Sequence, residues 1–436
     1  MQKINIILTL LCVIYFASSA IAQVPSPSRA TGKPIALMNG VAHLGTGDVI
    51  ENSIITIIDG KIAVVADART VRMDLSGYDQ IALEGKHIYP GLILPNTIMG
   101  LVEVSAVRAT VDYNELAGIN PNVRSIIAYN AESELIPTTR SNGILLAQVT
   151  PQGGTISGTS SIVQFDAWNW EDAAYKTDDG IHLNWPNMFS RSGWWAEPGE
   201  TKKNENYEER IKAMDLFFSE AKAYAAMENP AVANLKLEAM RGLFDGGKGL
   251  FIHANYGKEI IASIKFAKEH GVNKVVIVGG EDALMALDFL KENQVSVILS
   301  DLHRLPNRPE EDVDLPYKLA SILHKEGVLV ALGYEGVSNA RNLPFFAGTA
   351  ARAGLTKEEA LMTVTSNTAK ILGIDDRTGT LEQGKDANII VSTGDVLDMR
   401  TNNIEIAFIQ GNLLSLDDKH KALYQKYKDK YEGDKH

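Results

Sequence analysis

The chain has a single cysteine, Cys12, which lies inside an apolar run near the N-terminus. Residues 1–22 begin with the positive charge of Lys3, continue through that run and end in small residues up to Ala22, which is the pattern of a secretory signal peptide. We therefore expect an exported protein, periplasmic or secreted. Without Cys12 the mature chain has no thiol, which excludes disulfides, thiolate metal sites and cysteine nucleophiles.

Long hydrophobic runs and positive charge are also scarce. The N-terminal apolar run is about 14 residues long, short of the roughly 20 that cross a bilayer, so we expect no permanent membrane anchor. The formal charge is −12, and −13 once Lys3 is removed, which would repel nucleic acid. No Gly-x-Ser-x-Gly motif supports a serine hydrolase. A small molecule is the expected ligand.

Short, alternating β-rich segments lie at both ends of the mature sequence. Residues 34–90 contain two such runs joined by Asp59-Gly60, a strong two-residue hairpin signal. A second β-rich block occupies residues 378–415. We expect the two blocks to form one composite, discontinuous β-sandwich domain.

Between these blocks, residues 91–377 alternate apolar strand-like runs with amphipathic helical stretches. This pattern is typical of a parallel sheet covered by helices, and the length suits a (β/α)8 barrel of the TIM type. An open doubly wound sheet is the competing fold. Residues 416–436, rich in Lys, Asp and Tyr, predict a charged helical tail.

Three C-terminal segments resemble the closing signature of the amidohydrolase superfamily: residues 354–361 (GLTKEEAL), 365–374 (TSNTAKILGI) and 379–391 (GTLEQGKDANIIV). Upstream, residues 88–93 (IYPGLI) resemble the first barrel strand of the same superfamily. The similarity is greatest to imidazolonepropionase-like amidohydrolases, and it implies a metal-assisted hydrolase of non-peptide C–N bonds, typically of cyclic amides, with a β-sandwich beside the barrel.

The resemblance also shows what the chain has lost. A His-x-His pair normally follows the first strand and holds the metal, but Asn96 and Ile98 stand in its place. After the fifth strand, His253 matches the expected metal-binding histidine. The resemblance therefore implies one divalent metal, zinc, with His253 as the ligand that remains.

Two further family positions have changed. Glycine replaces the histidine expected after the sixth strand, in Gly279-Gly280. The aspartate expected after the eighth strand is replaced by Tyr334 or Glu335, depending on register, and only Glu335 is a chemical substitute. We therefore predict that Glu335 is catalytic and that Asn96 and Tyr334 contact the substrate.

Other side chains add to the candidate site. Asp301 and His303 directly follow the seventh strand, with a spacing that allows both to face the barrel mouth as a displaced acid–base pair. Trp168 and Trp170 begin a tryptophan-rich stretch and are predicted to stack on a substrate ring. Solvated loop residues and a structural lid are the simpler interpretations of these groups.

The sequence thus predicts an exported amidohydrolase-related protein with an eroded metal centre and weak or lost C–N hydrolysis. The alternative is a non-catalytic protein that retains the pocket and binds a small molecule or a partner. A hydrolase that relies on relocated acids is a third hypothesis. Pairing with a second copy or with a related amidohydrolase stays open.

Overall fold

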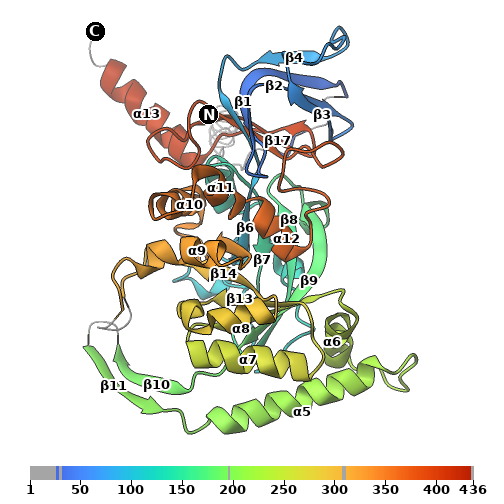
Figure 1. The fold of residues 1–436 in the computed structure, drawn as a ribbon, viewed down its shortest axis with the longest axis vertical. Coiled ribbons are helices and arrows are strands. Elements are labelled where there is room, and N and C mark those ends of the chain that lie inside the picture. The colour runs from blue at the N-terminus through green and yellow to red at the C-terminus, as the bar shows by residue number, and fades with distance from the viewer. Residues whose placement is uncertain (1–25, 29–31, 195–196, 307–310, 434–436) are drawn as a thin grey trace, which may run out of the picture.

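The structure is a computed structural model that describes residues 26–28, 32–194, 197–306 and 311–433. Figure 1 shows a β-rich layer at one end of the molecule and a helix-covered barrel below it. The predicted signal peptide lies outside the described residues. None of the described helices is long and apolar enough to cross a membrane.

The β-rich layer is one hydrogen-bonded sheet built from both ends of the chain. In order across the sheet its strands are β18 (Asn412–Leu413), β17 (Ile404–Ile409), β16 (Ile389–Ser392), β5 (His87–Pro90), β1 (Ile35–His43), β2 (Val49–Ile58) and β3 (Lys61–Asp67), with β4 (Asp79–Ala82) beside β1. N- and C-terminal segments thus share a sheet, while the sandwich arrangement and the domain boundaries stay predictions.

The predicted hairpin is present between β2 and β3. Asp59 and Gly60 have φ angles of 48° and 78°, and Ile58 pairs directly with Lys61. Positive φ at both turn residues matches the strand twist of a two-residue hairpin, which is why Asp-Gly is favoured there.

The second sheet forms a TIM-type barrel. Its strands, in order, are β15 (Val330–Gly333), β14 (Ser296–Ser300), β13 (Val275–Gly279), β12 (Gly249–Ala254), β9 (Ala174–Asn184), β8 (Ile156–Gln164), β7 (Ile144–Val149) and β6 (Leu92–Thr97). Inward-facing apolar side chains fill it, including Ile93, Leu146, Phe251 and Ile298.

One strand departs from the predicted all-parallel arrangement. Strand β8 runs antiparallel to both β7 and β9, whereas the other barrel pairings are parallel. The connection from Val149 to Ile156 explains this difference, because a parallel crossover needs a dozen or more residues.

The barrel closes where β15 approaches β6. The backbone N–H of Ile98 donates to the carbonyl oxygen of Glu335 at 3.0 Å. At the other end of this seam, the N–H groups of Ile93 and Leu332 donate to Val364 at 2.9 Å and to Thr363 at 3.1 Å. Residues 363 and 364 thus close the gap between the two strands.

Amphipathic helices cover the barrel, as the buried spacing of Ile260, Ile264 and Ala267 in α7 illustrates. The helices are α2 (Ser125–Ala128), α3 (Leu135–Arg140), α4 (Trp170–Ala173), α5 (Tyr207–Ala225), α6 (Leu235–Asp245), α7 (Gly257–Glu269), α8 (Leu287–Glu292), α9 (Leu315–Lys325), α10 (Leu343–Arg352), α11 (Lys357–Met362), α12 (Ser366–Leu372) and α13 (Lys419–Gly433), with 3-10 turns at Arg108–Thr110, Ala283–Ala286 and Ala340–Asn342.

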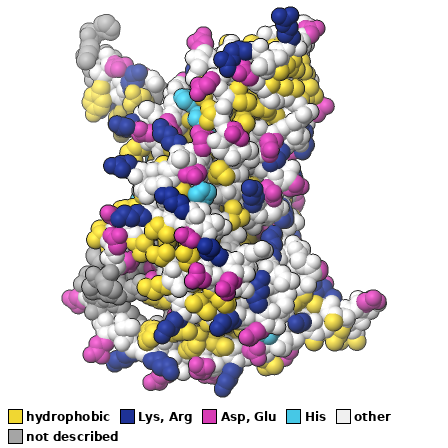
Figure 2. Space-filling model, in the orientation of Figure 1, with side chains coloured by type: hydrophobic (Ala, Val, Ile, Leu, Met, Phe, Trp, Pro, Cys, Tyr) yellow, Lys and Arg dark blue, Asp and Glu magenta, His cyan; other side chains and the backbone are white. Residues whose placement is uncertain are grey.

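Two peripheral features project from this body in Figure 1. Strands β10 (Phe189–Trp194) and β11 (Glu197–Lys203) form a separate hairpin after β9, and α13 extends from the body toward the C-terminus. Figure 2 shows positive and negative side chains interspersed over the visible face, without a large area of one sign.

Candidate functional site

A buried polar layer lies above the apolar filling of the barrel. The side chain of Gln148 on β7 donates to Asp179 at 2.7 Å and to Ser160 at 3.3 Å. The hydroxyl of Ser160 on β8 also donates to Asp179, at 2.8 Å. All three side chains are buried, so three neighbouring strands are tied together by one internal hydrogen-bond network.

Asp179 is the acidic member of this network. Its burial raises the pKa of the carboxyl, and the hydrogen bonds from Ser160 and Gln148 oppose that change by stabilising the carboxylate. A buried acid held by neutral donors can carry either a proton or a charge. It therefore gives the barrel interior a titratable group beneath the mouth.

Two histidines meet at the next level toward the mouth. Nδ1 of His182 on β9 and Nε2 of His253 on β12 share a hydrogen bond of 3.0 Å. The ring of His182 also stacks on Phe251, with centroids 4.8 Å apart and planes within 5° of parallel. The residues alternate along β12, so Phe251 and His253 both face inward.

Burial keeps this pair neutral. Burial lowers the pKa of His253 to about 4. It also lowers the pKa of His182 well below its usual value, and repulsion from a protonated His253 would lower it further. Nε2 of His182 is buried without a hydrogen-bond partner among the described residues. An unpartnered buried nitrogen is costly, and it marks a position where a ligand atom or a water can bind.

Asn96 lies at the end of β6 in an unusual backbone conformation. Its φ angle is 52°, in the left-handed region that asparagine tolerates better than most residues. Its N–H donates to Gln148 at 3.2 Å, and its side-chain oxygen is buried without a partner among the described residues. Asn96 is thus linked to the polar layer, and its contact with a substrate stays a prediction.

Glu335 follows β15 and faces the loop after β7. Nε2 of Gln152 donates to its carboxylate at 2.8 Å. The side chain remains accessible to solvent, yet the surrounding protein removes enough water to raise the pKa of its carboxyl. The predicted acid–base residue therefore lies at the barrel mouth with a perturbed proton affinity.

Asp301 and His303 follow β14, as predicted, but the structure does not bring His303 to the histidine pair. Nε2 of His303 contacts the hydroxyl of Thr349 at 2.8 Å, and its ring lies edge-on to Phe346, both on α10. Asp301 is exposed, with a φ angle of 52°. Their assignment as a catalytic pair stays a prediction.

The remaining predicted contacts are dispersed. The hydroxyl of Tyr334 lies 3.2 Å from Ser338 and its ring approaches Phe346, so it turns toward α10. Trp168 and Trp170 follow the end of β8, beside the first half of β7. Because β8 is antiparallel, both tryptophans lie at the end of the barrel opposite to the histidine pair.

The donor set does not fit a tightly held catalytic metal. Within the part of the chain that the structure describes, no group of three or more His, Cys, Asp or Glu side chains is placed to hold one ion. His253 and His182 supply two imidazoles, whereas catalytic zinc normally has three protein ligands. Zinc binding at His253 stays a prediction, and no step proposed below depends on it.

His182, Asp179 and Gln148 are the site residues that sequence reasoning missed. Gln148 is a single polar residue in an apolar run, whereas Asp179 and His182 lie in residues 174–184 (AYKTDDGIHLN), a mixed segment without the apolar pattern of a barrel strand. The alternation of a strand places such a residue inside or outside the barrel only once its register is known, and the antiparallel turn of β8 changes that register. No spacing in the sequence connects His182 with His253.

With this geometry established, comparisons with known proteins assign the family. The sequence model described as the amidohydrolase family matches residues 156–414, more than half of the chain. The chain belongs to the amidohydrolase family. The predicted resemblance is therefore confirmed, as is the TIM-type barrel that it implied.

Individual relatives are more distant. A 5-methylthioadenosine/S-adenosylhomocysteine deaminase from Moorella thermoacetica is 29% identical over 165 residues, which cover 33% of this chain and only 38% of that protein. An amidohydrolase from Thermotoga maritima has a TM-score of 0.76 at 23% identity, over 87% of this chain and 99% of the other. An adenosine deaminase from Xanthomonas campestris with bound zinc has a TM-score of 0.51 at 14% identity, over 93% and 99%. At these identities the two solved structures show the fold alone.

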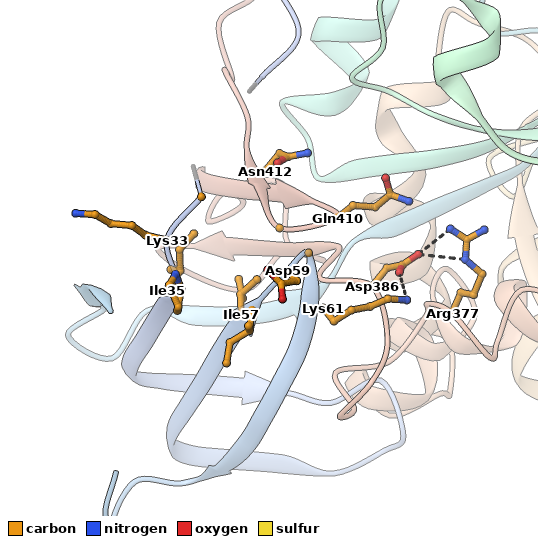
Figure 3. A pocket seen from close by; sticks show the side chains of 14 residues that line it. Lys33, Ile35, Ile57, Asp59, Lys61, Arg377, Asp386, Gln410 and Asn412 are labelled. Atoms are coloured by element: carbon orange, nitrogen blue, oxygen red, sulfur yellow. Dashed lines mark hydrogen bonds and ion pairs between the residues drawn. The ribbon is translucent and has the colours of Figure 1, made fainter. Parts of the chain in front are cut away.

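A separate pocket of about 540 Å³ lies in the β-rich layer, near the Asp59-Gly60 turn (Figure 3). Lys61 and Arg377 both converge on Asp386, at 2.5 Å and 3.0 Å. Asp386 is almost completely buried and its pKa is lowered: burial raises it, but the hydrogen bonds from Lys61 and Tyr175 and the charge of Arg377 outweigh that effect. These contacts satisfy its carboxylate and tie the sheet to residues near the barrel.

Proposed function

We propose that this protein is a C–N hydrolase of the amidohydrolase family that binds a small cyclic-amide-type compound at the barrel mouth and hydrolyses it slowly. The single observation that carries the proposal is the buried His182–His253 pair, which remains at the mouth where other expected metal ligands are replaced. The family membership supports the reaction class.

The histidine pair can orient a substrate carbonyl. In a neutral pair one ring donates the shared hydrogen and the other accepts it, so each ring has one further nitrogen available. Depending on the tautomers, the pair presents an N–H donor at His253 and a lone pair at His182, or the reverse. An N–H directed at the carbonyl oxygen would stabilise the negative charge that develops as water attacks.

Glu335 is the proposed proton-transfer group. Its raised pKa brings its proton affinity closer to neutral pH, which favours general acid–base catalysis. It would accept a proton from the attacking water and pass it to the departing nitrogen. General acid–base catalysis typically contributes about 10²–10⁴-fold, well short of a complete hydrolase, which is why we propose slow turnover.

The test is hydrolysis of a panel of cyclic amides, ureides and amino-purines by purified protein, with metal content measured on the same sample. The proposal expects slow hydrolysis that survives chelation and is lost in His253→Asn and Glu335→Gln. His324→Asn, a change on α9 that leaves the mouth untouched, is the matched control. Hydrolysis that requires a stoichiometric metal would contradict it.

A binding protein without catalysis is the second candidate. The pairing of His253 with His182 favours it, because each ring uses one nitrogen in the shared hydrogen bond and only the other nitrogen can face a ligand or metal. Compounds that raise the melting temperature without being hydrolysed would support this candidate over the first. The double variant Asn96→His with Ile98→His tests whether added ligands restore zinc binding.

Export, and pairing with a second copy or a related amidohydrolase, are also proposed from the sequence. N-terminal sequencing of protein from the cell envelope tests cleavage after Ala22, and the molar mass in solution tests self-association. Protein that stays in the cytosol with an intact N-terminus would contradict export.

A further inference from the structure

The pocket of about 540 Å³ in the β-rich layer is separate from the barrel mouth. Strand β5 of the sheet leads directly into β6, so the sheet lies at the end where that barrel strand begins, opposite to the mouth. Two hairpin turns line the pocket: Asp59-Gly60 between β2 and β3, and Gln410-Gly411 between β17 and β18. Its volume is within the range of about 300–1,000 Å³ that is typical of small-molecule sites.

The two turns touch each other because each of them contains a glycine. A Cβ on Gly60 would come within 2.7 Å of the carbonyl oxygen of Gln410, and a Cβ on Gly411 would come within 2.8 Å of the Cα of Gly60. Both glycines also have positive φ angles, of 78° and 77°. Any other residue at these positions would push the turns apart, so the glycines hold them together as one wall of the pocket.

Two positively charged side chains that line the pocket are fixed in place (Figure 3). Lys61 and Arg377 both contact the buried carboxylate of Asp386. The guanidinium group of Arg377 also lies 3.9 Å from the centre of the Tyr175 ring and donates to the carbonyl oxygen of Tyr175 at 2.8 Å. Because these contacts position both cations before a ligand arrives, binding at them costs little side-chain entropy.

Both cations keep hydrogen-bond donors for a ligand. The ammonium group of Lys61 has three N–H groups and uses one of them on Asp386. Arg377 uses Nε and one N–H of Nη2 on Asp386, and one N–H of Nη1 on Tyr175, so each terminal nitrogen has a second N–H left. The side chains of Lys61 and Arg377 are 49% and 37% exposed, whereas that of Asp386 is only 4% exposed. This cluster therefore presents its positive charges outward and buries its negative one.

The charges that line the pocket leave an excess of one positive charge. Three cations line it, Lys33, Lys61 and Arg377, against two carboxylates, Asp59 and Asp386, and three minus two is one. A single carboxylate or phosphate group would balance this excess. The chain as a whole has a formal charge of −12, so the local excess is opposite in sign to the rest of the protein. The pocket is therefore suited to a ligand with a negatively charged group.

The volume of the pocket indicates that the negatively charged group belongs to a larger molecule. A carboxylate or phosphate group alone would fill only a small part of about 540 Å³. The other side chains that line the pocket are apolar or carry amides: Pro34, Ile35, Ile57, Ile58, Gln410 and Asn412. The amides can donate and accept hydrogen bonds, and the apolar side chains can pack against a carbon skeleton. A small organic anion fits both kinds of lining.

We propose that this pocket binds a small organic anion, whose carboxylate or phosphate group contacts Lys61 and Arg377. The site is independent of the proposed hydrolysis and would be present in a purely binding protein as well. Asp59 limits the affinity, because its negative charge lines the same pocket and opposes that of the ligand.

Isothermal titration calorimetry of the full chain at pH 7.5, with inorganic phosphate and with succinate, tests the site. Lys61→Gln keeps a donor for Asp386 but removes the charge, so it should weaken binding by about five-fold or more. Asp59→Asn keeps a favoured hairpin turn, now Asn-Gly, and removes the opposing charge, so it should tighten binding by about three-fold. A gain in affinity cannot result from unfolding. The anion that binds more tightly identifies the preferred group.

Asp48→Asn is the matched control for Asp59→Asn. Asp48 is exposed and precedes β2, so the same change of charge lies at the opposite end of that strand, roughly 30 Å away and beyond the screening length of about 10 Å. This variant should leave the affinity unchanged. Amide chemical shifts of residues 57–61 and 409–412 should follow the titration. The proposal is refuted if neither anion binds, if Lys61→Gln binds as well as the wild type, if the two aspartate variants behave alike, or if the shifts occur only at the barrel mouth.

Discussion

Among the residues that the structure describes there are two pairs of hydrogen-bonded histidines, and their surroundings differ. In the barrel, His182 and His253 are 3.0 Å apart, with the ring of His182 against Phe251. At the edge of the sheet, His43 and His87 are 2.9 Å apart, and Glu358 on α11 accepts a hydrogen bond from His43. The nitrogen-to-nitrogen geometry is nearly the same.

The two pairs differ in how their surroundings act on a protonated ring. The barrel pair has no carboxylate in its hydrogen bonds, so desolvation dominates and a charge on either ring is strongly disfavoured. The sheet pair has Glu358 to balance one charge. Nearly identical contacts therefore have different surroundings: burial keeps the barrel pair neutral, whereas the sheet pair is hydrogen-bonded to a carboxylate. Each prediction below alters one side of this comparison.

The largest expected effect comes from removing the apolar support of the barrel pair. The ring of Phe251 stacks on His182 and lies over Gly180, where an added Cβ would come within 2.2 Å of it. Phe251→Ala should lower the free energy of unfolding by about 3–5 kcal/mol, because it leaves a cavity in the barrel. Urea denaturation measures this, and exposed Phe189→Ala, the control, should change it by less than about 0.5 kcal/mol. Equal effects would show that the barrel interior is not packed as described.

Acid should destabilise the protein through the barrel pair. The pKa of His253 is about 4, whereas an unfolded histidine titrates near about 6.5. Between these values the unfolded chain binds a proton that the folded chain does not, so the free energy of unfolding falls as pH decreases. The loss from His253 should be on the order of 2–3 kcal/mol between pH 6.5 and 4. Urea titrations across this range should show a smaller loss in His253→Asn, and an unchanged loss would contradict the assignment.

Breaking the sheet pair should cost less at neutral pH. His43→Ala removes a hydrogen bond to the carboxylate of Glu358, whose other oxygen already lacks a partner among the described residues. Hydrogen bonds to charged groups contribute about 1.5–3 kcal/mol, so thermal and urea unfolding at pH 7.5 should show a loss in that range. His324→Ala removes the more exposed pair with Glu359 and should cost no more than about 1 kcal/mol. A larger loss in the control would contradict this ranking of the two histidine–glutamate contacts.

The two pairs also show how far the sequence could be interpreted. The family motif predicts His253 as a metal ligand, and the family position predicts Glu335 as an acid; both roles stay predictions. His182 could not be found in the same way, since its partner is 71 positions away and lies on a different strand, β12. A regular β–α alternation predicts the barrel correctly but hides one antiparallel strand.

The direction of the chain after a strand also explains why several predicted site residues lie away from the histidine pair. Asp301 and His303 are predicted to face the barrel mouth because they follow a strand. The backbone after β14 instead turns His303 toward α10. Trp168 and Trp170 were placed there because aromatic loops often cover pockets. The antiparallel β8 carries them to the other end. In both cases the sequence gives the element but not the direction of the chain beyond it.

The smallest expected effect concerns Glu259, because burial raises the pKa of this acid whereas it lowers the pKa of His253. Glu259 on α7 is almost completely buried, accepts a hydrogen bond from the N–H of Met188 at 2.8 Å, and has a raised pKa because of desolvation. Above its unfolded pKa the folded chain holds the proton more tightly than the unfolded chain, so this group's contribution to stability falls as pH rises. Glu259→Gln keeps the acceptor but removes the charge, and should raise the free energy of unfolding by about 1 kcal/mol at pH 7.5 and leave it unchanged at pH 4. Urea denaturation at both pH values decides this, with exposed Glu220→Gln as the control on α5. A gain at pH 4 equal to that at pH 7.5 would mean that packing, and not the buried charge, sets the difference.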